Sequence, residues 1–318
     1  MKKYIIIVIS IAFLLGISKV NAQVRLIGEQ SVYTMYYLNP VLVNPGATGY
    51  EGYHSVVLNY RKAWASFPNS PSTGTLSYNG PIGNRIALGI LAYTDSYGAF
   101  NTNKGQISFS YNLDMPNNKL GIGISAEYIQ HKLNGDAVAN PLVDITDEEI
   151  FSRLNGSRYF DASIGIFGIY DDKVTYGVAL PSVISQRLDD DSNTLVGRDF
   201  GLIANLGYKF DLVDKDLVIE PSIYAKQIML VPFHVDINLR LGLLDEKLTM
   251  GVSYSTGAEN RLGFIVGAYL DNFGVFYGYN TSFNQFQSFN NGSHELSLKL
   301  KLQPLKTSQS QTQVIQSK

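Results

Sequence analysis

The sequence predicts an all-β protein, a transmembrane outer-membrane β-barrel of about fourteen antiparallel strands with short periplasmic turns and longer extracellular loops. Three observations lead to this prediction. Apolar and polar residues alternate in segment after segment of the 318-residue chain, which is typical of strands with two different faces. Short and longer connections alternate between these segments. Many segments have ~9 to 11 residues, the length that a tilted strand needs to cross a bilayer.

The first residues have the order of a secretory signal peptide. Two lysines precede an apolar stretch from Tyr4 to Gly16, and the small residue Ala22 ends the segment. We therefore expect residues 1–22 to be a signal peptide that is removed on the way to the bacterial outer membrane. No later stretch of the sequence offers the ~18 to 20 apolar residues of a spanning helix, so helical insertion is excluded.

Residues 23–52 lack the alternation of a strand and contain two Asn-Pro pairs, Asn39-Pro40 and Asn44-Pro45. Proline fixes φ, removes a backbone donor and disfavours helix at the preceding residue. Irregular backbone cannot face lipid, because its polar groups would stay unsatisfied there. We expect these residues to form an N-terminal segment inside or beneath the barrel. Our hypothesis is that Asn39 to Gly49 fill the lumen or line the periplasmic mouth and help to hold a partner.

The barrel itself is expected over residues 53–303. In the clearest strand, Phe233, Val235 and Ile237 share one face while His234 and Asp236 share the other, so one face suits lipid and the other a polar interior. The predicted strands are 53–62, 72–80, 84–95, 104–114, 118–131, 159–170, 173–181, 198–211, 216–227, 233–244, 247–255, 261–270, 273–283 and 294–303.

The connections supply an independent signal. Tight turns are expected at 80–83, 115–117, 171–172, 212–215, 245–246 and 271–272, and longer connections at 63–71, 96–103, 132–158, 181–197, 228–232, 256–260 and 284–293. An even strand number leaves both barrel ends in the periplasm, beside the short turns. Residues 304–318 are polar and are expected to form a periplasmic tail. Aromatic residues near predicted strand ends are interpreted as interfacial girdles: Tyr60, Trp64, Phe67, Tyr93, Tyr170, Tyr208, Phe210 and Phe273.

A soluble β-sandwich or barrel is the alternative fold. The face opposite the apolar one argues against it, because this face is rich in glycine and small polar groups where a soluble sheet usually carries charges. A narrow or partly filled lumen explains such a face better. Its glycines include Gly121, Gly123, Gly207, Gly251, Gly263 and Gly267.

Composition and motifs argue against several functions. A formal charge of −2 without a basic face excludes nucleic acid as a partner. There is no cysteine, no metal-binding histidine spacing and no Gly-x-Ser-x-Gly motif, so we expect no catalytic residue, cofactor or metal, and not an enzyme. Asp189, Asp191 and Asn193 match the start of a calcium loop, but its glycine and glutamate are missing. A solvated acidic loop is the favoured interpretation.

The N-terminal segment resembles a known family. Its Asn-Pro, apolar stretch, Asn-Pro, small residue and glycine follow tyrosines, as in the PorP/SprF family of outer-membrane proteins of the type IX secretion and gliding machinery. The resemblance implies binding of a large secreted adhesin through its C-terminal sorting domain, and contacts with periplasmic or peptidoglycan-linked secretion components. The residues that carry the motif, and form the candidate partner or plug segment, are Tyr33, Tyr37, Asn39, Pro40, Asn44, Pro45, Gly46, Ala47 and Gly49.

A diffusion channel or small-solute transporter is the alternative function within the same fold. A general porin needs a charged constriction, and the polar faces of the predicted strands carry charges that would supply one. These residues are Lys209, Lys226, Arg240, Lys299, Lys301, Glu127, Glu220 and Asp236.

Overall fold

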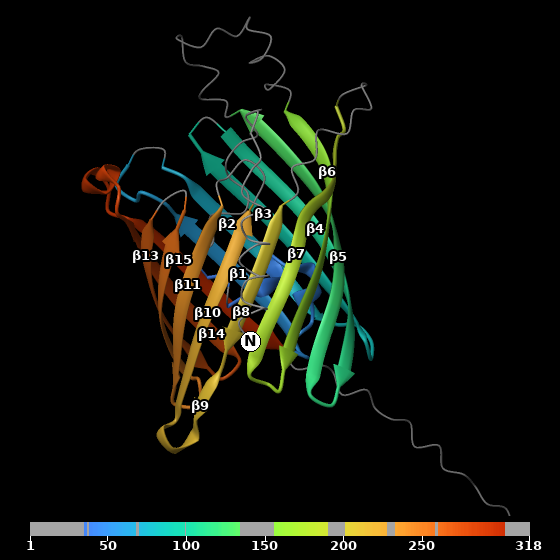
Figure 1. Ribbon diagram of the computed structural model, residues 1–318. Coiled ribbons are helices and arrows are strands. Elements are labelled where there is room, and N and C mark those ends of the chain that lie inside the picture. The colour runs from blue at the N-terminus through green and yellow to red at the C-terminus, as the bar shows by residue number, and fades with distance from the viewer. Residues whose placement is uncertain are drawn as a thin grey trace, which may run out of the picture.

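The strands form a single antiparallel sheet that closes into a barrel (Figure 1). Neighbours in sequence pair with one another, β1 pairs with β15, and β10 pairs with β11. The computed structural model describes residues 35–36, 38–67, 70–98, 100–133, 156–189, 201–227, 233–257 and 260–302. Its 15 strands occupy fourteen positions, because β8 and β9 lie end to end against β10. The predicted barrel is therefore confirmed.

The strand bounds follow the predicted alternation closely. They are β1 His54–Lys62, β2 Ser72–Pro81, β3 Ile86–Tyr97, β4 Phe100–Met115, β5 Asn118–Leu133, β6 Ser157–Tyr170, β7 Val174–Arg187, β8 Leu202–Tyr208, β9 Phe210–Leu212, β10 Leu217–Gln227, β11 His234–Leu243, β12 Leu248–Thr256, β13 Arg261–Leu270, β14 Phe273–Ser282 and β15 Ser293–Leu302. Short 3₁₀ turns lie at η1 Pro40–Leu42, η2 Pro45–Ala47, η3 Val213–Lys215 and η4 Gln285–Phe289.

The two faces of the sheet differ as the alternation requires. On β4, Ile107 and Phe109 face outward with 48% and 46% of their surface exposed, whereas Ser108 and Ser110 face the lumen at 2% each. An apolar outer wall and a polar interior are the arrangement of a barrel that crosses a lipid bilayer. No helix among the described residues is long and apolar enough to span a membrane.

Two expected loops are wrong. Strands β3 and β4 pair as far as Tyr97 and Phe100, so the longer connection expected at 96–103 is a tight hairpin, with Gly98 at a φ of 57°. Strand β7 does not end at Pro181 but continues to Arg187. Three residues of β7, Pro181 to Val183, lie opposite the single residue Ser163 of β6, and this bulge in β7 accommodates the proline, which has no ladder donor.

The remaining turns separate the rims of the barrel. The start of β1 and the end of β15 lie at the same rim, since His54 pairs with Leu302, and the short turns lie there too. We call this the short-turn rim and the opposite one the long-loop rim. Residues 1–22, the motif residues Tyr33 and Tyr37, most of the loop 132–158 and the tail 304–318 lie outside the described residues.

Candidate functional site

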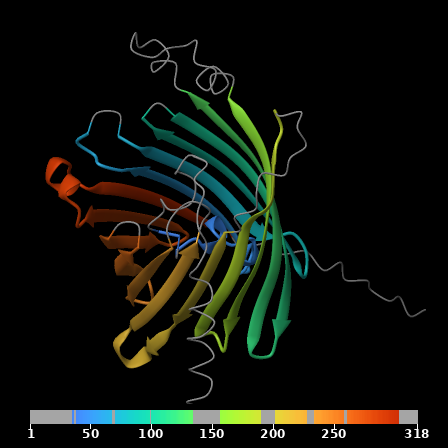
Figure 2. The same cartoon turned by 45° about the horizontal axis from the view of Figure 1, so that its top comes forward.

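The N-terminal segment lies inside the barrel, where the blue turns of η1 and η2 are ringed by strands in both views (Figures 1 and 2). We call residues 35–53 the plug; all of them except residue 37 are described. Of the motif, Asn39, Pro40, Asn44, Pro45, Gly46, Ala47 and Gly49 lie in the plug and are buried. Each asparagine precedes a proline that opens a 3₁₀ turn, since proline has the φ such a turn needs.

Asn44 joins the plug to the wall. Its Oδ1 accepts a hydrogen bond from the Gly46 amide at 2.9 Å. Its Nδ2 donates to the carbonyl oxygen of Ile166 at 2.9 Å and lies 3.5 Å from that of Val178. These two carbonyls belong to paired residues of β6 and β7. One side chain therefore closes the turn of η2 and attaches it to two neighbouring strands.

The lumenal glycines of β5 and β6 form the niche for this turn. A Cβ atom at Gly123 would lie 2.2 Å from the Pro45 carbonyl oxygen, and one at Gly121 would lie 2.1 Å from that of Gly46. Gly46 itself has no room, because its Cβ would approach the backbone of Gly165 to 2.8 Å. The glycine-rich lumen face thus allows backbone to touch backbone.

Polar contacts continue along the plug on both sides of the niche. Thr48 Oγ1 lies 3.0 Å from Ser108 Oγ on β4. The Gly49 amide donates to Asn79 Oδ1 at 3.2 Å, and Asn39 Nδ2 donates to Ser77 Oγ at 3.1 Å, both on β2. Buried polar groups are costly unless they are paired, so these contacts satisfy polar groups of the plug that could not face lipid.

Apolar contacts also join the plug to the wall. Leu42 and Val43 pack with Tyr93 and other buried residues in one cluster, and Met35 packs with Phe276 in a second. Tyr93 was expected in an interfacial girdle; instead it faces the lumen at 3% exposure, because the plug offers it an apolar partner. Between the plug and strands β1, β14 and β15 remains a cavity of about 10 Å³, room for no more than about one water molecule.

A buried charged group holds the start of the plug. The hydroxyl of Tyr36 donates to Asp236 on β11, and Lys226 Nζ on β10 lies 2.5 Å from the same carboxylate. The ammonium group also lies 4.2 Å from the centre of the Tyr36 ring, a cation–π distance. Burial and then the Asp236 charge raise the pKa of the Tyr36 hydroxyl well above its usual range, so it stays a donor.

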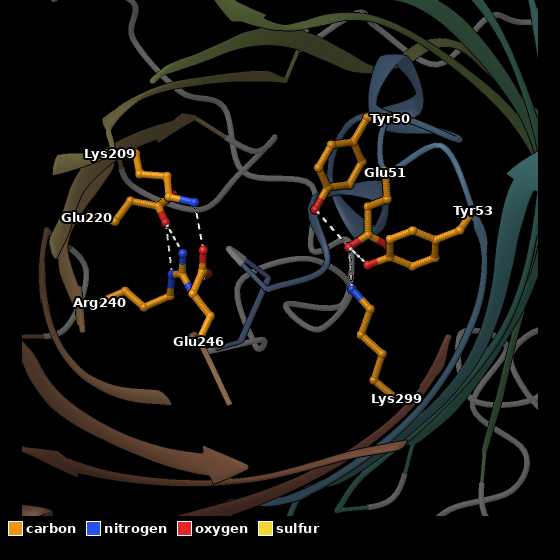
Figure 3. Close-up of polar contacts among 8 residues, drawn as sticks. All are labelled: Tyr50, Glu51, Tyr53, Lys209, Glu220, Arg240, Glu246 and Lys299. Atoms are coloured by element: carbon orange, nitrogen blue, oxygen red, sulfur yellow. Dashed lines mark hydrogen bonds and ion pairs between the residues drawn. The ribbon is translucent and has the colours of Figure 1, made fainter. Parts of the chain in front are cut away.

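The end of the plug is held by a second carboxylate. Glu51 Oε1 lies 2.6 Å from Lys299 Nζ on β15 and accepts hydrogen bonds from the hydroxyls of Tyr53 at 2.7 Å and Tyr50 at 3.4 Å (Figure 3). Burial, followed by the Glu51 charge, raises the pKa of both tyrosines. Both hydroxyls therefore remain protonated donors to this carboxylate.

A separate ion-pair network lies on the wall, near the short-turn rim (Figure 3). Arg240 contacts Glu220 at 2.5 Å and Glu246 at 2.9 Å, and Lys209 contacts Glu246 at 2.6 Å. At Glu246, burial alone would raise the pKa, but the hydrogen bond from Lys209 and the charge of Arg240 outweigh it and leave the pKa below its ordinary value. The carboxylate is charged near neutral pH.

Most charges predicted to face the lumen do so as members of pairs. Three pairs were described above: Lys226 with Asp236, Arg240 with Glu220, and Lys299 with Glu51. In a fourth pair, Lys104 lies 3.3 Å from Glu127. Lys301 lies over the Tyr269 ring at 3.6 Å. Sequence reasoning missed the partners Tyr36, Glu51, Lys104 and Glu246. For Lys104 a signal existed, since it lies on the polar face of a predicted strand.

This arrangement is suited to holding a segment in place. The described residues contain no group of three or more histidine, aspartate or glutamate side chains placed to bind a metal. Asp189, from the acidic loop, accepts a hydrogen bond from the Arg158 amide; the other residues of that loop lie outside the described part of the chain.

Comparison with known proteins identifies the family. The model of the family "Type IX secretion system membrane protein PorP/SprF" matches residues 27–300. The chain belongs to the PorP/SprF family. This match spans both the plug and the barrel, and it agrees with the resemblance found in the Asn-Pro motif.

No curated protein matches this PorP/SprF chain significantly. Solved structures similar to it include the outer membrane protein Omp33 of Acinetobacter baumannii, with 10% identity and a TM-score of 0.46 over 79% of this chain and 98% of that one. The toluene transporter TodX of Pseudomonas putida has 9% identity and a TM-score of 0.48 over 84% and 91% of the two chains. A FadL homologue of Pseudomonas aeruginosa has 12% identity and a TM-score of 0.45 over 81% and 91%.

Proposed function

We propose that this PorP/SprF barrel is a partner-binding component of type IX secretion, and neither a pore nor an enzyme. In this proposal it sits in the outer membrane after removal of the signal peptide. There it binds a large secreted adhesin through the adhesin's C-terminal sorting domain and supports its export or surface anchoring, linked to gliding motility. Family membership over residues 27–300 is the observation that carries the proposal.

The plug favours a binding role over the alternative of a diffusion channel. A channel needs a continuous aqueous path, whereas the plug contacts strands on several sides of the lumen, including β2, β6 and β11. Lumenal charges of a porin face the permeating solute, while those near this plug pair with one another. We also propose that the short-turn rim, where the plug ends, faces periplasmic or peptidoglycan-linked components of the machinery.

The direct test is purification of the tagged full chain from its native outer membrane in mild detergent, with mass spectrometry of what remains bound. We expect a very large secreted protein and secretion components. Recovery of the barrel alone would contradict the proposal and favour the channel.

The role of the plug in partner binding is tested by deleting residues 33–49. We expect partner recovery and adhesin export to fall while the barrel still inserts into the membrane. A folded deletion variant with undiminished partner recovery and export would show that the plug has no part in binding. Substitution of Asn260, which is exposed at the long-loop rim, by alanine is the matched control and should change neither.

A further inference from the structure

A hollow lies on the outer wall of the barrel, toward the long-loop rim. It has a volume of about 550 Å³ and is lined by residues of strands β1 to β5. Its floor is formed by Gly74, Ala92 and Gly105, which face outward on three adjacent strands. A Cβ atom added to Gly105 would meet nothing within 4 Å. At other outward-facing positions the wall carries large apolar side chains. The hollow is therefore about as deep as one of these side chains is long.

The hollow has an apolar and a polar end. Leu76, Ala92, Gly105 and Tyr128 follow one another across β2 to β5 in a single row of paired residues. The next row toward the long-loop rim is Gly74, Thr94, Asn103 and Gln130. The exposed groups therefore change from hydrocarbon to hydroxyl and amide between one row of paired residues and the next.

The polar row has no partner in the wall. No hydrogen bond joins the side chain of Thr94, Asn103 or Gln130 to any other residue in the described part of the chain. An amide exposed to hydrocarbon without a hydrogen bond is costly. These side chains are therefore available to hydrogen-bond a polar group supplied from the membrane.

Positive charge follows the polar row. Lys132 lies two residues beyond Gln130 on the same outward face of β5, and Arg158 pairs with Gln130 from β6. Both side chains are exposed; Arg158 has a distant ion-pair partner in Asp189, at 3.9 Å. The series from apolar hollow to amides to cations matches an amphiphile with an acyl chain and an anionic head group.

We propose that this hollow binds one phosphorylated lipid of the outer leaflet, of the lipid A type. Its acyl chain lies against Gly105, its polar linkage faces Asn103 and Gln130, and its phosphate lies near Lys132 and Arg158. The leaflet follows from the position of the hollow, because the long-loop rim of such a barrel is extracellular. This site is separate from the plug and from the partner binding proposed above.

The test uses the full-length protein in mild detergent, incubated with lipid A or with zwitterionic phosphatidylethanolamine, and counts bound lipids by native mass spectrometry. We expect one lipid A molecule to be retained. Gly105→Leu, which fills the hollow, should reduce retention about tenfold. Lys132→Ser leaves the wall intact and should weaken retention of lipid A without affecting phosphatidylethanolamine. Ala268→Leu, an outward substitution on β13, is the matched control and should change neither.

Equal retention of both lipids by the wild type would show only general coating by lipid and would overturn the proposal. The same conclusion would follow if Gly105→Leu and Ala268→Leu retained as much lipid A as the wild type. Cross-linking of a partner's membrane segment to residue 105 in native membranes, in place of lipid, would also contradict it. None of these results bears on adhesin binding, so the two proposals stand or fall separately.

Discussion

At the scale of single residues, the family motif consists of residues that fit the plug against the inner wall of the barrel. Asn44 satisfies backbone groups of both the plug and the wall, and Gly46 is the residue for which the niche has room. The prolines place the 3₁₀ turns, and Ala47 is fully buried against Phe167. These residues have no chemistry of their own, and their value lies in a defined path for the chain through the lumen.

Asn44→Ala removes the acceptor for the Gly46 amide and the donor to β6 and β7. We expect a loss of about 2 kcal/mol in stability, since each buried group left unpaired costs about 1–3 kcal/mol. Unfolding by urea in detergent, followed by tryptophan fluorescence, measures the change. Asn260→Ala, at an exposed position, is the control. If the two variants unfolded at the same urea concentration, the contacts of Asn44 would contribute nothing.

Glu246 makes a contribution to the stability of the folded barrel that depends on pH. Its pKa is lower in the folded barrel than in the unfolded chain, so the contribution is full above the ordinary value of about 4.5 and is lost as the pH falls through the folded value. Because the side chain is about one-third exposed, we expect about 1 kcal/mol or less.

In the Tm–pH profile, Glu246→Gln should lower Tm near pH 7 and reduce the fall toward acid. Asp271→Asn, at a turn residue whose φ of 53° suits asparagine, should leave the profile as in the wild type. A wild-type acid slope in Glu246→Gln would contradict the role given to this carboxylate.

At the scale of elements, the strands were predictable because lipid and lumen impose a strict period of two. The predictions were wrong at residues where a bulge or a contact with the plug overrides this period. Pro181 was taken as a strand end, but it lies in a bulge of β7, and the strand continues beyond it. Tyr93 was placed in an interfacial girdle because it lies near a predicted strand end. Strand β3 is apolar on both faces, so only the plug shows that this side chain faces the lumen. The glycine-rich lumen face predicted a narrow or filled interior, and the irregular Asn-Pro segment was the hypothesised filling, but neither pattern revealed which glycines its turns would contact.

The position of the plug predicts a specific cross-link. Thr48 Oγ1 and Ser108 Oγ are 3.0 Å apart, and the chain has no cysteine of its own. In a Thr48→Cys, Ser108→Cys variant we expect oxidation to form a disulfide between plug and β4 in the folded protein. Counting free thiols before and after unfolding measures it, with Thr48→Cys alone as the control. Two thiols that stay free under oxidising conditions would place the plug elsewhere.

At the scale of the whole molecule, barrel closure brings together residues that no local pattern connects. The pair Glu51–Lys299 spans 248 positions in sequence, and Tyr36–Asp236 spans 200. The strand period predicts which charges face the lumen, but the pairing also depends on strand order, register and the path of the plug. For this reason the fold and the motif were predictable from sequence, while the ion pairs that hold the plug were not.

The plug inside this closed barrel bears on the choice between the two functions considered for the chain. An open barrel of this size would conduct ions, whereas a barrel closed by residues 35–53 would act, as we propose, through the surfaces that it presents to partners. The family assignment over residues 27–300 favours the second role, and the plug supplies its physical basis. The proposed binding role therefore depends most on whether the lumen is closed in the membrane.

Single-channel conductance in planar bilayers tests this claim most directly. We expect the wild-type protein to insert without stable open-channel steps, and the variant lacking residues 33–49 to insert and conduct. Conductance by the deletion variant is the positive control, because it shows that an open barrel inserted in the bilayer can be detected. Stable wild-type conductance equal to that of the deletion variant would contradict the claim that the plug closes the lumen, and would favour a diffusion channel.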